Sequence, residues 1–213
     1  MTQKTSTAIK LILLVLLSLP FTQSFSQSKK EIMKIKPPQP APNFIMKDLN
    51  GITINLADYR GKKIMLTFYR NVGCPVCNLR FHELQEQSGY FKSKGLVLLA
   101  VYESTADNMK KYLEDLEGEN LYAIMIPDPD QDLYKRYDID RSMGKMMKGM
   151  FHGAMGKMKQ GKKLFKNKIR QDGNANRIGA DFLIDENGIV KTAYYGKFIG
   201  DHLPLTDIKQ FLN

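Results

Sequence analysis

The chain has 213 residues, of which 43% are hydrophobic and 25% charged, a balance that is ordinary for a single-domain globular protein. The net charge of +10 belongs to one segment, because residues 141–171 hold ten Lys or Arg residues and no Asp or Glu. Only two cysteines occur and they lie three positions apart, which excludes the disulfide framework of many secreted proteins.

Residues 1–26 have the layout of a secretory signal peptide. Lys4 and Lys10 precede an apolar stretch over 11–21, and Ser24-Phe25-Ser26 supplies a small-x-small cleavage site. The alternative is an uncleaved N-terminal anchor, but a spanning helix needs roughly 20 apolar residues and this stretch is about half as long. We therefore expect an exported protein, periplasmic or secreted, that begins near residue 27.

The next segment, 27–42, is polar and rich in proline, which predicts an extended linker rather than packed structure. The folded domain is expected over 43–213. It opens with apolar residues on either side of Asn50-Gly51, a sequence that predicts a β-hairpin extension at the N-terminus of the domain.

Strands and helices then alternate along the chain. Short apolar runs predict buried strands at 63–69, 95–102 and 121–126. Helical patterns follow them at 75–93, 105–116 and 130–137. A second hairpin around Asn187-Gly188 joins strands 180–185 and 189–195, and a helix at 205–212 closes the chain. This order predicts an α/β fold with a central mixed sheet flanked by helices.

Cys74 and Cys77 are the strongest candidates for chemistry. Cys74 directly follows the first buried strand and enters the helix predicted from Pro75. Free backbone N–H groups and the positive dipole end at a helix N-terminus favour a thiolate there. Cys77 lies one turn further on the same face, so the pair is expected to cycle between dithiol and disulfide. We assign Cys74 as nucleophile and Cys77 as resolving cysteine, because Cys74 is expected nearer the helix end and the solvent.

Other uses of the pair are less consistent with the sequence. Half a zinc site would need a second Cys/His pair, which the chain lacks, and His82 points about 140° away from Cys77 on a helix. Haem attachment would need a histidine where Asn78 stands. An inert pair is the remaining alternative. The sequence predicts no metal and no cofactor.

The basic segment 141–172 is an insert with helical methionine spacing. Its Met residues, together with Phe151, recur at helical intervals with lysines between them, which predicts an amphipathic helix. We expect this helix to pack over the domain and wall the site. Two alternatives remain: an anionic membrane surface or acidic partner, and Cu(I) held by M-x-x-M pairs near His152. An exported protein is not expected to bind nucleic acid through this run.

Several motifs together resemble the alkyl hydroperoxide reductase/thiol-specific antioxidant (AhpC/TSA, or redoxin) family, in its peroxiredoxin-like branch. They are Ala41-Pro42-Asn43-Phe44, Asp48-Leu49-Asn50-Gly51, Leu66-Thr67-Phe68-Tyr69-Arg70, the cysteine pair, and Phe182-Leu183-Ile184-Asp185-Glu186-Asn187-Gly188. The resemblance covers about residues 41–140 and 175–213. It implies a thioredoxin-like fold and a thiol oxidoreductase with antioxidant activity that reduces peroxides or protein disulfides and is itself reduced by a thioredoxin-like protein.

The sequence departs from two signatures of related families. Peroxiredoxins carry Pro seven positions and Thr or Ser three positions before the reactive cysteine, where this chain has Thr67 and Asn71. Thioredoxins carry a cis-proline where this chain has Gly179. Arg70 is the best accessory candidate, because a cation four residues before Cys74 is expected to lower the pKa of Cys74 or to orient a peroxide oxygen. The alternative is a strand-end arginine held by surface carboxylates. Arg177 is a weaker accessory candidate.

These observations leave two hypotheses. The first is an enzyme that uses the Cys74/Cys77 dithiol, and the second is a Cu(I)-handling chaperone that combines the cysteines with the methionines.

Overall fold

The computed structural model describes residues 34–114, 121–164 and 170–213. The predicted signal peptide lies outside them, as do residues 27–33 of the linker. Residues 32–213 form one compact unit.

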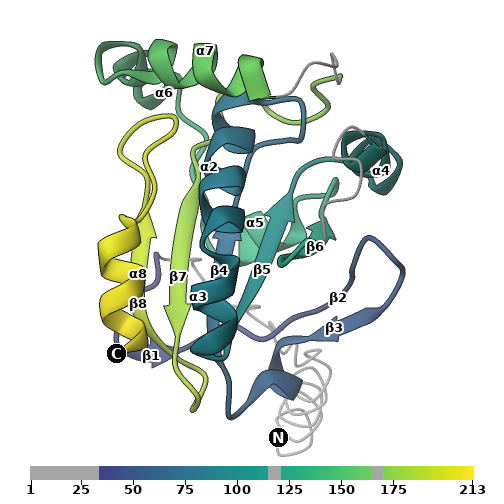
Figure 1. Ribbon diagram of the computed structural model, residues 1–213, viewed down its shortest axis with the longest axis vertical. Helices are drawn as coiled ribbons and strands as arrows, with labels where there is room; N and C mark the ends of the chain where they lie inside the picture. Colours follow the sequence, from purple (N-terminus) through teal and green to yellow (C-terminus); the bar gives the residue numbers. More distant parts are fainter. Residues whose placement is uncertain (1–33, 115–120, 165–169) are drawn as a thin grey trace, which may run out of the picture. The chain divides into compact units, whose positions relative to one another are not determined.

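A six-stranded mixed sheet forms the centre of this unit (Figure 1). Its strand order is β1-β8-β7-β4-β5-β6. Strands β4, β5 and β6 are parallel, whereas β7, β8 and β1 run antiparallel to their neighbours. The bounds are β1 Gln39–Pro40, β4 Lys63–Phe68, β5 Leu96–Tyr102, β6 Ile124–Pro127, β7 Ala180–Ile184 and β8 Ile189–Tyr195. The predicted α/β fold with a central mixed sheet is confirmed.

Strand β4 lies between β5 and β7 and is buried on both faces, which explains its continuous apolar run. Met65 and Tyr69 face one core cluster, with α2 (Pro75–Glu86), α3 (Ser88–Ser93), α4 (Ala106–Glu114) and α8 (Leu205–Leu212). Leu66 and Phe68 face the other, with α5 (Asp132–Arg136) and the N-terminal hairpin. The strand that leads into the cysteines is therefore fixed between two packed layers.

The N-terminal hairpin forms where it was predicted, as β2 (Ile45–Lys47) and β3 (Thr53–Asn55), but it is a separate two-stranded sheet. A short 3-10 helix, Leu56–Tyr59, follows it. The predicted helix 75–93 is divided into α2 and α3 at Gln87. Ser88 and Gly89 follow this break, and both are weak helix formers.

The described part of the predicted linker is mostly exposed, but it is attached to the domain at two places. Gln39 and Pro40 pair with the first residues of β8 and extend the sheet by one short strand. Ile35 is buried, and its backbone N–H donates to the Tyr195 hydroxyl at 2.9 Å. The prolines permit this because an edge strand needs few ladder donors.

The insert forms two helices instead of one, α6 (Met143–Phe151) and α7 (Ala154–Leu164). His152 and Gly153 separate them, and Gly153 has φ = 81°, which favours glycine. Two backbone segments pair where this excursion of the chain begins and ends. There Arg141 and Arg177 form an isolated antiparallel bridge, and the Ser142 N–H donates to the Asn176 carbonyl at 2.9 Å.

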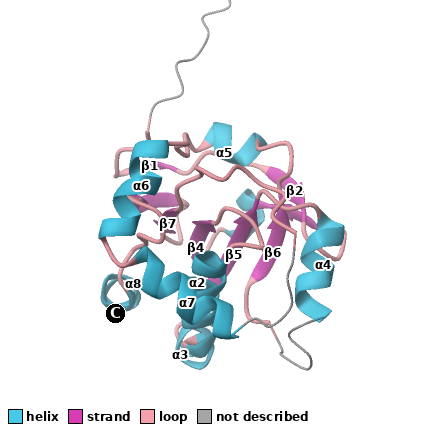
Figure 2. Cartoon of the chain, turned by 90° about the horizontal axis from the view of Figure 1, so that it is seen from above, coloured by secondary structure: helices cyan, strands magenta, loops and turns pink. Residues whose placement is uncertain are grey.

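The insert packs on the domain, as expected, but with the opposite face. Helix α7 lies across the N-terminal end of α2 (Figures 1 and 2). The buried side is made of small residues, Gly149, Ala154 and Gly161, whereas the exposed side carries Met143, Met147, Met150, Phe151, Met155, Met158 and Leu164. Small residues allow two helices to approach closely, and here they face the domain in place of the methionines.

Candidate thiol active site

The loop from β4 to α2 holds Cys74 at the N-cap of α2, as the sequence predicted. The backbone N–H of Cys77 donates to the Cys74 Sγ at 3.4 Å, and Pro75 occupies the first turn. Two side chains fix the loop, because Asn78 donates to the Val72 carbonyl at 2.8 Å and the Val72 N–H donates to the Ser104 hydroxyl at 3.0 Å. Both cysteines are free thiols in this arrangement.

The two thiols have opposite pKa shifts. The pKa of Cys74 is lowered from 9.0 to about 6, first because the Cys77 thiol donates to it and then because of the Arg70 charge and the backbone N–H groups of Cys77 and Val76. Burial raises the pKa of Cys77 well above 9.0, and the neighbouring Cys74 thiolate raises it further. Near neutral pH this pair is one thiolate beside one thiol, which is the arrangement that nucleophilic attack followed by resolution requires.

Cys74 is closed off from the solvent, which corrects one premise of its assignment. It is 1% exposed and Cys77 is 7% exposed, so Cys74 is not the more accessible of the two. Helix α7 accounts for this closure, because Gly161 lies directly against Pro75: a Cβ on Gly161 would stand 2.0 Å from the Pro75 carbonyl oxygen. The assignment of Cys74 as nucleophile therefore depends on its ionisation and not on its exposure.

Arg70 lies at this site, as predicted, and is largely buried. Its Nη1 donates to the Ala175 carbonyl at 2.8 Å and its Nη2 to the Gln171 Oε1 at 2.9 Å. Its charge contributes to the lowered pKa of Cys74 and offsets part of the rise in the pKa of Cys77. The Nε atom of Arg70 is buried and has no hydrogen-bond partner among the described residues.

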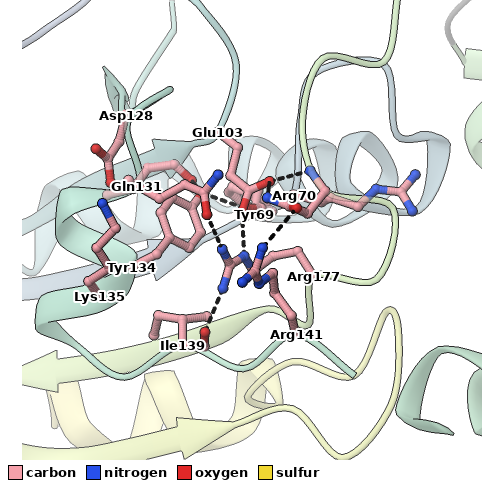
Figure 3. A network of polar contacts seen from close by, with 12 residues as sticks. Tyr69, Arg70, Glu103, Asp128, Gln131, Tyr134, Lys135, Ile139, Arg141 and Arg177 are labelled. Atoms are coloured by element: carbon pink, nitrogen blue, oxygen red, sulfur yellow. Dashed lines mark hydrogen bonds and ion pairs between the residues drawn. The ribbon is translucent and has the colours of Figure 1, made fainter. Parts of the chain in front are cut away.

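Arg177, the weaker candidate, has a scaffold role (Figure 3). It forms a buried ion pair with Glu103, donates to the Ile139 carbonyl, and donates to the Gln131 Oε1 at 2.8 Å. Its guanidinium also lies over the Tyr134 ring, 4.7 Å from the centroid. These contacts join the residue after β5, the start of α5 and the segment before β7.

Two of the three positions that depart from the related motifs, Thr67 and Gly179, have structural explanations. The Thr67 hydroxyl donates to the Asp181 Oδ1 at 2.6 Å within the sheet. Asn71 is fully buried, and its side-chain oxygen and nitrogen have no partners among the described residues. A Cβ on Gly179 would lie 2.6 Å from the His202 Cε1, so the ring of His202 occupies the space that a larger residue would need.

His202 and Asp181 form a buried polar pair near the site that the sequence does not predict. His202 Nδ1 lies 3.1 Å from the Asp181 Oδ2, and the His202 ring packs against Tyr69 with 5.6 Å between centroids. Burial alone would raise the pKa of Asp181, but His202 and other partners lower it to about 2. The sequence contained one sign of this pair, because Asp181 is a charged residue inside the apolar strand 180–184 and a buried charge requires a partner. Nothing local indicated that His202 would be that partner.

A groove of about 400 Å³ runs beside the cysteine motif along α2. Val76 and Arg80 line it from α2, Lys157 from the insert, and His202 from the loop before α8. Lys157 also donates to the Gly200 carbonyl at 2.8 Å, which ties α7 to the far side of the groove. The groove is therefore bounded by the motif, the insert and the C-terminal loop.

The cysteines and methionines do not form one site. Met143, Met147 and Met150 are more than half exposed, whereas both thiols are buried beneath α7. Within the described ranges, no three His, Cys, Asp or Glu side chains are grouped as metal ligands. The Cu(I) hypothesis therefore stays a prediction.

A thiolate and thiol at the N-terminus of the helix that follows the central strand of a thioredoxin-like sheet define a thiol-based redoxin. The chain belongs to the AhpC/TSA family, whose sequence profile matches residues 37–193. It is therefore a thiol redox protein of the peroxiredoxin or thiol-disulfide oxidoreductase type.

Similar proteins of both types are known. Thiol-disulfide oxidoreductase ResA of Bacillus subtilis is 32% identical over 104 residues, 46% of this chain and 54% of ResA. Peroxiredoxin Bcp of Bacillus subtilis is 28% identical over 107 residues, 50% of this chain and 66% of Bcp. The crystal structure of Peroxidoxin BcpB from Mycobacterium tuberculosis is 12% identical with a TM-score of 0.58, and the match covers 84% of this chain and 94% of that one. The structural likeness establishes the fold.

Proposed function

We propose that this protein is a two-cysteine thiol peroxidase that reduces small hydroperoxides. The Cys74 thiolate attacks the terminal peroxide oxygen, the S–O bond forms as the O–O bond breaks, and the departing oxygen takes a proton to leave as alcohol or water. The Cys77 thiol then attacks the Cys74 sulfenic acid, the S–S bond forms, and water leaves. A thioredoxin-like dithiol restores the pair by two exchange steps.

The observation that carries this proposal is an ionised thiol that is almost fully buried. With a pKa of about 6, Cys74 is mostly thiolate at neutral pH, yet it is only 1% exposed. A molecule the size of a peroxide needs a small opening to reach it, whereas a disulfide on a folded protein needs the sulfur at the surface. Burial and ionisation together favour the smaller substrate.

Arg70 is proposed to contact the peroxide. Two of its guanidinium nitrogens bind the segment after the insert, and Nε is left buried without a partner among the described residues. The positive charge stabilises the oxygen that becomes negative as the O–O bond breaks. Asn71, also in this loop, is buried, and its side-chain amide has no hydrogen-bond partner among the described residues.

Reduction of protein disulfides is the second candidate. The groove of about 400 Å³ beside Val76 supports it, because an extended peptide next to a disulfide fits such a groove. This reaction requires α7 to move away from Pro75, so that a mixed disulfide can form on Cys74.

Stopped-flow oxidation of the reduced protein by hydrogen peroxide, compared with insulin-disulfide reduction, tests the proposal. We expect rapid oxidation that is lost in Cys74→Ser. Cys77→Ser should react once, keep the sulfenic acid, gain one oxygen in mass, and fail to turn over. If the protein reduces insulin rapidly but reacts slowly with peroxide, the proposed peroxidase function is wrong and the disulfide reductase function takes its place. First attack through Cys77 would overturn the assignment of roles.

We further propose that the protein is exported and acts outside the cytoplasm, which the signal-like layout of residues 1–26 supports. N-terminal sequencing of the protein recovered from a cell fractionation tests this. A mature chain that begins within a residue of Gln27 in the exported fraction is expected, and an intact Met1 start in the cytoplasm would contradict it.

A further inference from the structure

The exposed side of the insert has a composition that is unusual for a protein surface. On α6, Met143, Met147, Met150 and Phe151 follow one another at intervals of four, three and one residues, so they form a single stripe along the helix. Their exposed fractions run from 54% to 87%. Met155 and Met158 are further exposed apolar residues, on α7. We call these six residues the methionine face.

The charged side chains of the two insert helices are all positive. Lys148, Lys159, Lys162 and Lys163 are exposed on the same two helices, and no Asp or Glu occurs between residues 141 and 164. In contrast, the buried side of the insert uses its lysines internally, since Lys145 pairs with Asp140 and Lys157 donates to the Gly200 carbonyl. The exposed lysines therefore remain available to an anionic partner.

We propose that the methionine face docks the protein on an anionic lipid bilayer. A paired apolar and basic helix surface lies in the headgroup region with its apolar side chains in the acyl boundary and its lysines near lipid phosphates. The surface consists of two helices at one end of the compact unit (Figure 1), which suits a flat, fluid layer more than a cleft on a folded partner. Flexible methionine side chains adapt to such a layer.

The docking is peripheral. Neither α6 nor α7 is long and apolar enough to cross a bilayer, and the same holds for every other helix in the described ranges. Because the opposite side of α7 covers Pro75, the bilayer would lie on one side of the insert and the cysteine pair on the other. The inference stands on the exposed side chains alone and does not depend on which substrate the thiols reduce.

Single-tryptophan reporters provide the test, because the chain contains no tryptophan. The chain from residue 27 is used, since it contains the compact unit 32–213 and lacks the apolar stretch at 11–21 that would itself bind lipid. Phe151→Trp reports on the methionine face. Ile52→Trp is the matched control, because Ile52 is also exposed, at 60%, but lies in the β2–β3 hairpin turn.

We expect the emission of Phe151→Trp to shift to the blue on vesicles of phosphatidylglycerol and phosphatidylcholine, and brominated lipid to quench it. The signal should be lost on pure phosphatidylcholine and in high salt, and Ile52→Trp should not respond. Equal responses of both reporters, or a response to pure phosphatidylcholine alone, would overturn the proposal. Binding to polyglutamate but to no vesicle would replace the bilayer by an acidic protein partner.

Substitutions in the Phe151→Trp background separate the two contributions. Lys148→Gln and Lys159→Gln should each lower the partition coefficient about fivefold. Met147→Glu should lower it about tenfold or more, because a methionine leaves the acyl boundary. The exposed lysines Lys36 and Lys62 lie outside the insert, so Lys36→Gln and Lys62→Gln serve as controls without effect. Equal losses in insert and control variants would contradict docking through the methionine face.

Discussion

Replacement of Gly161 by alanine tests whether helix α7 closes the thiol site. A Cβ at this position would stand 2.0 Å from the Pro75 oxygen and 2.6 Å from its carbonyl carbon, and real Cβ atoms essentially never come within 3.0 Å of such atoms. Because the obstacle is backbone, α7 must retreat from α2. Overpacking of this kind costs about 1–3 kcal/mol.

Gly156→Ala is the matched control on the same helix. No atom lies within 4 Å of the Cβ that it would add, so this variant gains only helix propensity, about 1 kcal/mol at most. Gly161→Ala has the same propensity gain, and the difference between the two variants therefore isolates the clash. We expect Gly161→Ala to be about 1–3 kcal/mol less stable than Gly156→Ala in urea unfolding.

The same pair of variants reports on access to Cys74. At pH 7.5 the thiolate already dominates, because the pKa is about 6, so the rate of alkylation by iodoacetamide measures how often the site opens. We expect alkylation to be faster in Gly161→Ala than in the wild type and unchanged in Gly156→Ala. Equal stabilities together with equal alkylation rates would refute the conclusion that α7 covers the cysteine motif.

Three further predictions follow from the site. The alkylation rate of Cys74 should rise through about pH 6 and level off above pH 8, because the thiolate is the reactive form above its pKa; a rate that still rises at pH 9 would contradict the lowered pKa. The titration midpoint of Cys74, followed by thiolate absorbance at 240 nm, should rise in Arg70→Met and rise less in Arg70→Lys, which keeps the charge. It should also rise more in Cys77→Ala than in Cys77→Ser, because serine keeps a hydrogen-bond donor. Unchanged midpoints would exclude the Arg70 charge and the Cys77 hydrogen bond as causes of the lowered pKa. Arg177→Met should lower the free energy of unfolding by about 3–5 kcal/mol, because it leaves Glu103 buried without its ion pair. The double variant Arg177→Met/Glu103→Gln should recover much of that free energy, because the buried charge is removed. Equal losses of stability in the single and double variants would contradict this reasoning.

Local patterns were sufficient to predict the sheet and the cysteine pair. A run such as 63–69 is apolar throughout because both faces of the sheet are covered, and Asn-Gly pairs mark turns wherever they occur. The position of Cys74 follows from the strand before it and from Pro75, which favours a helix start. Each of these features depends on neighbours in the sequence, so the sequence alone contains the information.

Contacts between distant segments were beyond such reasoning. His202 meets Asp181 only because β7 and the loop before α8 converge. Helical periodicity revealed the methionine stripe but could not show that the opposite side, with Gly149 and Gly161, would face the domain. Hydrophobic burial alone would place the methionines against the domain. The backbone of the domain lies so close to the insert, however, that only small residues fit between them, and the methionines therefore face outward.

The bridge between Arg141 and Arg177 also bears on how this protein was assembled. An excursion that departs and returns at one point leaves the strand order of the sheet unaltered, because neither β6 nor β7 has to be rerouted to accommodate it. A short turn between the two arginines would close the remaining chain, since antiparallel partners lie about 5 Å apart. The excursion is thus separate from the sheet in topology but not from the redox centre, because Arg70 donates to Gln171 and Ala175 within it and α7 lies against Pro75.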